Sequence, residues 1–285
     1  MDWTERRERF RAILGGERCV RPASVFDPLS ARIAAELGFE TAMFAGSTAS
    51  LTVLGAPDLI LLTLSEFAAQ CYRINRAGAP PLMVDADHGY GNALNAMRTV
   101  QELETAGVSG LSIEDTALPA NFGAADKMQL TSIAEGVGKM RASLAGRQDP
   151  RLCVVGRTSA ISVSGLDDTI ARGKAYEEAG VDALFFVGLK TRAQLDAIAE
   201  AVKTPLILGS IGAELEDMSY LAARRVRICL LPHLPIMAAV QAVHDTMKAQ
   251  RDGMPAAKIP GVAPSEFMQR LTRDKSYKSW SKEYL

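Results

Sequence analysis

The sequence has little net charge, no long apolar run and few cysteines, and each of these shortages excludes a class of protein. Its 32 basic and 33 acidic residues are mixed along 285 positions, so it has no basic field that could attract nucleic-acid phosphates or anionic lipids. The longest apolar runs, such as residues 59–64, are far too short to cross a bilayer. We therefore expect neither nucleic acid nor a membrane as a partner.

Motifs for a zinc site, a redox dithiol and a signal peptide are also missing. The four cysteines form no C-x-x-C pair, which argues against both a zinc site and a redox dithiol. Ordinary buried thiols are expected at all of these positions, Cys19, Cys71, Cys153 and Cys229. Residues 1–14 are charged and have the pattern of an amphipathic helix rather than of a signal peptide. These features predict a cytoplasmic protein.

What the sequence does have is a repeated alternation of a short apolar run with roughly ten to fifteen residues of helical periodicity. The apolar runs predict strands at residues 22–26, 41–45, 81–85, 110–114, 152–156, 183–187, 205–208 and 226–231. The helical patterns predict helices at residues 28–37, 65–78, 92–106, 131–146, 167–179, 191–201, 214–223 and 234–250. This alternation predicts an α/β fold, a closed (β/α)8 barrel of the TIM type.

An open doubly wound sheet is the alternative fold for such an alternation. Its dinucleotide-binding version requires G-x-G-x-x-G after the first strand, whereas the turn here reads Asp27-Pro28-Leu29-Ser30. A single barrel of roughly 250 residues also accounts for the length of the chain. We therefore predict one domain over residues 1–285, with the barrel at about 20–250 and a short helical appendage at about 251–285.

Polar and ionisable residues follow the predicted strands directly, at the end of the barrel where (β/α)8 enzymes place their reacting groups. Random loop polarity would give more lysine and asparagine and fewer acids immediately after β runs. In chain order the residues are Asp27, Ser47, Asp85 with Asp87, Glu114 with Asp115, Arg157, Gly188, Gly209 with Ser210, and His233. The carboxyl end of the barrel is therefore the predicted site.

The pair Asp85 and Asp87 is the strongest single feature of this set. Residues i and i+2 of a strand point the same way, so both carboxylates are expected to enter the barrel mouth together. Carboxylates so close repel each other unless a cation lies between them, and Mg²⁺ prefers such oxygen ligands while keeping several waters. The sequence thus predicts a magnesium site of Asp85, Asp87 and Glu114, with direct or water-mediated contacts. The alternative is that these acids cap the helix that starts near Asn92.

Several other residues have both a functional and a structural interpretation. Gly46 and Ser47 offer free backbone N–H groups and a hydroxyl that can cradle an oxyanion, but Ser47 can equally be a helix cap or turn residue. Arg157 follows a buried strand and should face either a substrate anion or an acid in a salt bridge. His233 is either a structural histidine or a site residue at the barrel mouth. Asp115 either takes part in the chemistry or serves the loop that follows it.

Together these segments resemble a known family. The resemblance is carried by Gly46-Ser47, Ala56-Pro57-Asp58, Asp85-Ala86-Asp87-His88-Gly89-Tyr90-Gly91-Asn92, Ile113-Glu114-Asp115 and Val155-Gly156-Arg157-Thr158. They are similar to the isocitrate lyase and phosphoenolpyruvate mutase superfamily, and within it to the bacterial oxaloacetate decarboxylases, over roughly residues 10–250. The resemblance implies a modified barrel whose eighth helix is exchanged between subunits, and a homotetramer built as a dimer of dimers.

The resemblance also implies a cofactor and its ligands. The cofactor would be Mg²⁺, with Mn²⁺ as a possible substitute, bound together with a small 2-oxo dicarboxylic acid. Asp85 would hold the metal, while Asp87 and Glu114 would support it through waters.

Substrate contacts are implied in the same way. Ser47, with Gly46 beside it, and Arg157 would contact the carboxylate and the enolate oxygen of the substrate. His233 matches a substrate-contacting histidine of the decarboxylase branch. Asp58 stands in one of the matching segments and is taken as a catalytic residue together with Arg157 and His233.

The loop after the fourth predicted strand separates the chemistries of the superfamily. Isocitrate and methylisocitrate lyases carry a K-[KR]-C-G-H run there, whereas residues 115–123 contain no cysteine. Phosphonopyruvate mutases and hydrolases place polar residues in this loop, which here is mostly apolar apart from Thr116 and Asn121. One departure from the decarboxylases is Ile211, where an aromatic residue is expected. The loop nevertheless favours Mg²⁺-dependent decarboxylation of oxaloacetate to pyruvate and CO₂ through a metal-stabilised enolate.

Rival interpretations stay open. The same scaffold serves C–C lyases of the 2-methylisocitrate type and phosphonopyruvate hydrolases, and a silent barrel that only binds a dicarboxylate is the non-enzymatic alternative. In the enzymatic interpretations, a mobile loop at residues 116–129 is expected to close over the site and exclude water.

Overall fold

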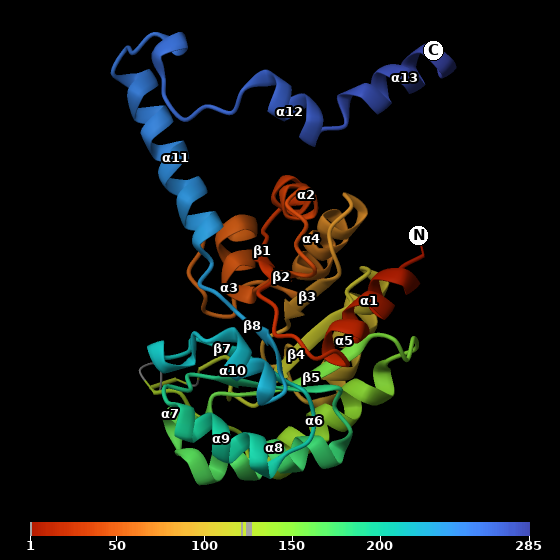
Figure 1. The fold of residues 1–285 in the computed structure, drawn as a ribbon, viewed down its shortest axis with the longest axis vertical. Helices are drawn as coiled ribbons and strands as arrows, with labels where there is room; N and C mark the ends of the chain where they lie inside the picture. Colours follow the sequence, from red (N-terminus) through yellow and green to blue (C-terminus); the bar gives the residue numbers. More distant parts are fainter. Residues whose placement is uncertain (1, 121, 124–126) are drawn as a thin grey trace.

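The structure is a computed structural model that describes residues 2–120, 122–123 and 127–285. Its centre is an eight-stranded sheet in which the spatial order of the strands follows the sequence and the neighbouring strands are parallel (Figure 1). The strands are β1 (Ala23–Ser24), β2 (Ala42–Phe44), β3 (Leu82–Asp85), β4 (Gly110–Glu114), β5 (Cys153–Thr158), β6 (Ala183–Val187), β7 (Leu206–Gly209) and β8 (Val226–Cys229). The predicted (β/α)8 fold class is confirmed.

The two ends of the sheet meet just ahead of β1. The amide of Val20 donates to the carbonyl of Arg227 at 2.9 Å, and the amide of Cys229 donates to the carbonyl of Val20 at 2.9 Å. Val20 also forms a parallel bridge with Ile228. Because these contacts join the chain before β1 to β8, the carboxyl ends of the strands surround one common mouth.

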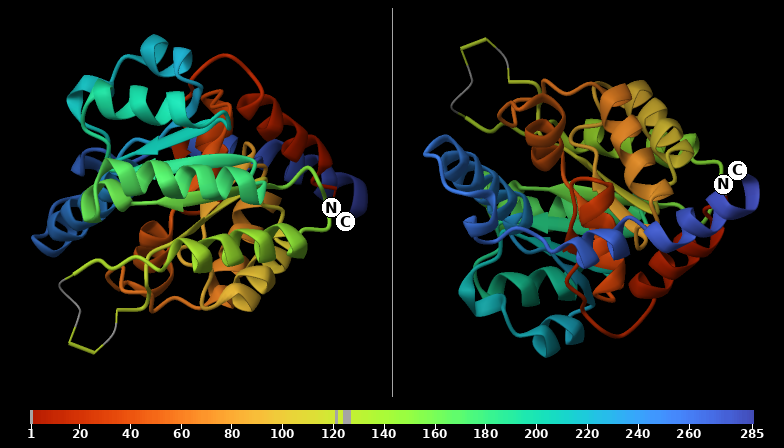
Figure 2. Two further views of the ribbon diagram at one scale, coloured as in Figure 1. Left: turned by 90° about the horizontal axis from the view of Figure 1, so that it is seen from below. Right: turned by 90° about the horizontal axis from the view of Figure 1, so that it is seen from above.

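Helices between the strands cover the outside of the sheet (Figure 2). They are α2 (Pro28–Glu36), α4 (Leu64–Arg76), α5 (Ala93–Thr105), α6 (Ile133–Gly146), α8 (Leu166–Ala179), α9 (Arg192–Ala201) and α10 (Met218–Ala223). Side chains at the amino ends fix where several of them begin. Thr63, for example, accepts from the amide of Glu66 while the Glu66 side chain accepts from the amide of Thr63, which is a capping box.

Short helices are the elements that the periodicity did not predict. They are α3 (Gly46–Ala49), the π-helical η1 (Ser50–Leu54), α7 (Ala160–Val163), η2 (Ala213–Leu215) and η3 (Ala256–Lys258). The helix predicted over 214–223 was wrong in its first half. Asp217 accepts from the amides of Ser219 and Tyr220 and so begins a new helix, α10, after η2.

The barrel interior is closed at its amino end by α1 (Thr4–Leu14), the amphipathic helix expected at the start of the chain. The interior apolar cluster combines α1 side chains with strand residues and contains Phe10, Leu14, Val20, Met43, Ala45, Met83, Cys153, Val155, Ala183, Phe185, Ile207 and Ile228. Phe10 is fully buried in it, and a side chain added at Gly110 would collide with the Phe10 ring. Filling one end of the barrel with α1 leaves the carboxyl end for chemistry.

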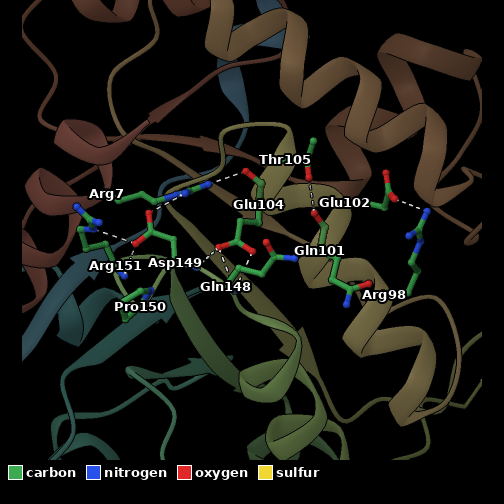
Figure 3. Close-up of a pocket in the computed structure, with 10 residues that line it drawn as sticks. All are labelled: Arg7, Arg98, Gln101, Glu102, Glu104, Thr105, Gln148, Asp149, Pro150 and Arg151. Carbon is green, nitrogen blue, oxygen red and sulfur yellow. Dashed lines mark hydrogen bonds and ion pairs between the residues drawn. The ribbon is translucent and has the colours of Figure 1, made fainter. Parts of the chain in front are cut away.

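Polar contacts fasten α1 to the barrel (Figure 3). The Arg7 guanidinium donates to the carbonyls of Glu104 and Val108 and pairs with Asp149 at 2.8 Å. The Glu104 carboxylate accepts from the amide of Gln148 at 3.0 Å. These groups line a cavity of about 690 Å³, but its charged side chains are largely paired with one another and it lies at the closed end of the barrel. We attribute a structural role to it.

The chain after β8 leaves the barrel. In Figure 1, α11 (Leu234–Arg251) projects away from the sheet, and α12 (Ser265–Leu271) and α13 (Asp274–Tyr284) run back across the molecule. The return is fixed by Arg270, which pairs with Glu36 of α2 at 2.9 Å, and by Arg32, which donates to the carbonyl of Leu271 at 2.8 Å. The short helical tail predicted over about 251–285 is thus confirmed, and it contains α12 and α13.

The expectation of buried thiols is met at three of the four cysteines. Cys71, Cys153 and Cys229 are buried free thiols, while Cys19 is half-buried. Among the helices that the structure describes, none has the length and apolarity needed to span a membrane.

Candidate active site at the carboxyl end of the barrel

A cavity of about 310 Å³ opens at the carboxyl ends of the strands. Its lining combines acids, one arginine and one histidine with apolar side chains, and consists of Met43, Ala45, Ser47, Asp58, Asp85, Arg157, Phe185, Val187, Gly209, Ser210, Leu230, Leu231, Pro232 and His233. The structure therefore brings together most of the residues that the sequence singled out, from positions spread between 47 and 233.

Arg157, on β5, is the cationic centre of the site. Its guanidinium forms a short ion pair with Asp85 and a second one with Glu114 at 3.1 Å. It also lies 5.4 Å from the centre of the Phe185 ring. Burial alone would lower the pKa of Arg157, but the two carboxylates raise it overall, so it stays charged. The prediction that Arg157 faces an acid is confirmed, and Phe185 is a neighbour that the sequence did not indicate.

Carboxylates outnumber cations around Arg157. Burial, followed by the charges of neighbouring acids, raises the pKa of Asp87 to about 9. Burial and the charge of Asp85 raise the pKa of Asp58, and burial raises that of Glu114 although Arg157 opposes the shift. Four acids thus share one guanidinium, and protons or a further cation must compensate the excess negative charge.

Asp87 reaches this cluster by a route that differs from the predicted one. Strand β3 ends at Asp85, and Asp87 has a left-handed backbone with φ of 48°. Strand alternation therefore does not align the two carboxylates. The Asp87 carboxylate packs against Gly46, where an added Cβ would lie 2.7 Å from its Oδ1, and the carbonyl of Asp87 accepts from the amide of Glu114 at 2.8 Å. The sequence predicted the proximity correctly but the reason for it wrongly.

Asp85 is oriented by a hydroxyl that the sequence analysis missed. Ser112 Oγ donates to Asp85 Oδ1 at 3.2 Å, and the amide of Asp87 contacts the same oxygen at 3.3 Å. Ser112 precedes Glu114 by two positions on β4, so strand alternation on the one strand could have indicated that it faces the same side. The alternative that the acids cap the following helix is wrong, because the Asn92 side chain caps α5.

Ser47 lies in the first turn of α3 and lines the cavity, while Ala45 is the residue at the helix cap position. The cap interpretation of Ser47 is therefore wrong. Asp58 follows η1 and reaches the same cavity from the next segment of chain. Both positions depend on the short helical segment over 46–54, which lets the chain after β2 fold back over the barrel mouth.

His233 stands at the junction between β8 and α11, as the residue that precedes the first turn of α11. Its Nδ1 lies 2.8 Å from Ser24 Oγ, and one side of its ring faces the cavity. Burial lowers the pKa of His233, although the charge of Asp85 opposes the shift, so the neutral imidazole is favoured. The structure places His233 at the mouth as predicted, and Ser24 is a second hydroxyl that the sequence analysis missed.

Asp115 is turned away from the cavity. Its buried carboxylate accepts from Arg172 at 2.9 Å and from the Tyr176 hydroxyl at 2.6 Å, and its carbonyl accepts from the amide of Thr131 at 2.8 Å. Arg172 also donates to the carbonyl of Thr131 at 3.0 Å. These bonds hold both ends of the segment 116–130 together. They support the structural interpretation of Asp115, in service of the loop.

The loop expected to cover the site is described in part. A bridge between Thr116 and Leu130 closes its base. Asn121, one of its two polar residues noted above, and residues 124–126 lie outside the described residues.

The acidic cluster has the donor chemistry of a site for a hard divalent cation. Asp85, Asp87 and Glu114 offer only oxygen, and a cation would relieve the repulsion that raises the pKa values of Asp87 and Glu114. Across the described residues, no three His, Cys, Asp or Glu side chains stand close enough together to bind one ion jointly. Mg²⁺ commonly takes only one or two carboxylates and keeps its waters, so it does not require three side-chain ligands in contact.

Comparison with known proteins adds independent evidence. Residues 10–251 match the family described as phosphoenolpyruvate phosphomutase. An oxaloacetate decarboxylase of Rhodopseudomonas palustris (strain BisB18) is 59% identical over 96% of this chain and 94% of its own length. Another, from Bradyrhizobium diazoefficiens, is 56% identical over 98% of this chain and 96% of its own length. A phosphonopyruvate hydrolase solved with oxalate and Mg²⁺ superimposes with a TM-score of 0.86 at 28% identity, over 98% of this chain and 99% of that one.

Proposed function

This chain belongs to the phosphoenolpyruvate phosphomutase family, and we propose that it is a carboxy-lyase that decarboxylates oxaloacetate to pyruvate and CO₂. The observation that carries the proposal is the single cavity of about 310 Å³ that Ser47, Asp85, Arg157 and His233 share. A cavity of this size suits a small ligand. Relatives at 53–59% identity over nearly the whole chain are oxaloacetate decarboxylases.

The proposed cofactor is Mg²⁺, with Mn²⁺ as a substitute of similar oxygen preference. Asp85 would hold the ion, with Asp87 and Glu114 beside it. Such an ion acts as a Lewis acid that polarises the 2-oxo group of the substrate. The excess of carboxylates over the single guanidinium supports this assignment, because a divalent cation offsets the repulsion that raises the pKa of Asp87 to about 9.

Two residues of this chain would stabilise the negative charge that develops on the substrate during decarboxylation. Arg157 and Ser47 line the cavity together and can donate to a carboxylate oxygen and to the enolate oxygen. One well-placed donor of this kind contributes about 3 to 4 kcal/mol to transition-state stabilisation. Asp58, which lines the same cavity, is proposed as a further catalytic residue whose raised pKa lets it hold a proton nearer neutrality.

The apolar part of the lining suits the carboxylate that leaves as CO₂. It includes Val187, Leu230 and Leu231, and His233 follows Leu231 by two positions in the chain. An apolar surrounding disfavours a localised carboxylate charge relative to the delocalised charge of the enolate. His233 would orient the substrate with a single hydrogen bond, which fixes the leaving group without stabilising its charge strongly.

We further propose that α11 is exchanged with a second copy of the chain and that two such dimers form a homotetramer. Helix α11 carries exposed apolar side chains along one broad side, at Leu234, Met237, Val240, Val243 and Met247, and only Ile236 is buried. An apolar groove of about 720 Å³ lies between α2, β1 and the start of α11. Such exposed apolar surfaces mark protein interfaces. A small 2-oxo dicarboxylic acid would be the other partner, and the cytoplasmic location expected from the sequence stays a prediction.

The test is the rate of pyruvate formation from oxaloacetate, after subtraction of the rate with Mg²⁺ and no enzyme. Chelation with EDTA should abolish the enzymatic rate, excess Mg²⁺ should restore it, and Asp85→Ala should lose most of it. Assays with 2-methylisocitrate and phosphonopyruvate run beside it. Rates near the wild-type value in EDTA and in Asp85→Ala, or faster turnover of either competing substrate, would refute the proposal. Oxalate binding that depends on Mg²⁺, without turnover of any 2-oxo acid, would indicate a silent barrel instead.

A further inference from the structure

Ser24 has a fixed place in the barrel wall although β1 is short. The amide of Ala23 donates to the carbonyl of Thr41 at 3.1 Å, and the amide of Val25 donates to the carbonyl of Met43 at 2.9 Å. Ala23 and Val25 are buried in the apolar layer between the sheet and the helices. Because successive side chains of a strand alternate, Ser24 points to the opposite side, toward the barrel interior.

The hydroxyl of Ser24 contacts the imidazole ring of His233. Ser24 Oγ and His233 Nδ1 are 2.8 Å apart, although 209 positions separate the two residues in the chain. His233 is among the residues that line the cavity and Ser24 is not. The effect of Ser24 on a substrate would therefore pass through the imidazole ring.

The chemistry of a neutral imidazole makes this contact consequential. A neutral imidazole carries one N–H donor and one nitrogen acceptor, so a donor at one ring nitrogen excludes a donor at the other. Asp58 and Asp85 line the cavity, and a substrate carboxylate would bring further acceptor oxygens. A nitrogen lone pair facing these oxygens would repel them, whereas an N–H group would attract them.

We propose that Ser24 is a positioning residue whose hydroxyl donates to Nδ1 of His233. This bond holds the ring as the tautomer that carries its hydrogen on Nε2. Nε2 is the ring nitrogen on the opposite edge, and it is the one that faces the cavity. The N–H of Nε2 is then the donor that binds the second carboxylate of the substrate. In this last respect the inference rests on the proposed function, because it takes a 2-oxo dicarboxylate as the substrate. The Ser24 contact thus makes His233 a hydrogen-bond donor, which favours substrates that place an acceptor oxygen next to His233.

The tautomer can be measured without any turnover. The chain has three histidines, so the spectrum of protein labelled with ¹⁵N-histidine is simple. Magic-angle-spinning ¹⁵N NMR of the sedimented full-length protein distinguishes protonated from unprotonated ring nitrogens at any oligomer size, and His233→Gln identifies the signals by their loss. We expect hydrogen on Nε2 in the wild type, a mixture of tautomers in Ser24→Ala, and the wild-type pattern in Ser24→Thr, which keeps the hydroxyl.

Kinetics supply the second readout. Loss of one neutral hydrogen bond predicts that kcat/KM for oxaloacetate falls about 2- to 10-fold in Ser24→Ala, and that Ser24→Thr restores it. The Mg²⁺ concentration for half-maximal activity should not change, because the acids of the metal site are untouched. Hydrogen on Nδ1 in the wild type, or an unchanged tautomer together with unchanged kcat/KM in Ser24→Ala, would overturn the inference. A wild-type protein that does not turn over oxaloacetate would overturn the proposed function, while the NMR measurement would still decide the role of Ser24.

Discussion

Asp87→Asn should stabilise the metal-free protein and remove much of the stabilisation that Mg²⁺ gives to the wild type. Asp87 is crowded by Asp85, Glu114 and Asp58, and burial with these charges raises its pKa from 3.8 to about 9. Asparagine has nearly the same shape and is neutral at every pH, so the folded protein needs no bound proton at this position to avoid the repulsion. It also removes the negative charge that attracts a cation.

The sign and size of the effect follow from proton binding. Between about pH 4 and about pH 9 the folded protein keeps a proton on Asp87 that the unfolded chain releases. This group therefore lowers the free energy of unfolding as pH rises through that window, by at most about 1.4 kcal/mol per pH unit. From roughly pH 5.5 to pH 7.5 the free energy of unfolding of Asp87→Asn should rise relative to that of the wild type by up to about 3 kcal/mol. Mg²⁺ at about 100 times its Kd would add about 2.7 kcal/mol to the wild type.

The assay is thermal unfolding at a fixed protein concentration, in EDTA and in excess Mg²⁺, at several pH values. For a chain of this size about 1 kcal/mol corresponds to roughly 2–4 °C in Tm. Glu200→Gln, which neutralises an exposed carboxylate on α9, is the matched control and should change little. A Tm difference between Asp87→Asn and the wild type that does not widen with pH in EDTA would show that this reasoning about the acidic cluster is wrong. Equal stabilisation of both proteins by Mg²⁺ would contradict the placement of the metal.

Further predictions test other parts of the structure. Gly46→Ala should lower Mg²⁺ affinity and decarboxylase activity, because its Cβ would lie 2.7 Å from Asp87 Oδ1. The control is Gly138→Ala, whose Cβ meets nothing within 4 Å and which should leave both unchanged. Titrations of activity with Mg²⁺ compare the two variants. Asp115→Asn should lower the free energy of unfolding by about 3 kcal/mol, because Arg172 on α8 loses a buried counter-charge. Mg²⁺ affinity should stay near wild type. An unchanged midpoint of denaturant unfolding would count against this structural role of Asp115. Val243→Glu should reduce the molar mass measured by light scattering, while Gln241→Glu on the same helix should not.

The barrel was predictable because its signal is repeated. Each buried strand is a short apolar run and each covering helix has a 3.6-residue period, so local errors at the ends did not change the order of elements. The segment over 46–54 was not predictable in the same way, since helices of four or five residues are too short to show a period. Because this segment was not predicted, the sequence left the local role of Ser47 open between a cap or turn residue and a site residue.

The candidate site was predictable as a set of residues but not as a set of contacts. The acids and Arg157 stood out because charged groups directly after apolar strands are costly unless they are paired. Ser24 and Ser112 did not stand out, because a serine in a strand becomes informative only when its partner across the barrel is known. The contact between Asp87 and Gly46 depends on a left-handed backbone that the i and i+2 rule does not describe.

His233 lines the substrate cavity and is also the residue that directly precedes α11. A helix is stiff along its axis, so any change in the direction of α11 is transmitted to the backbone that carries the imidazole. If α11 is seated on a second chain, catalytic competence becomes a property of the assembled particle. Activity per chain would then fall on dilution before the barrel itself unfolds, and a lag after rapid dilution would report the rate at which the subunits separate.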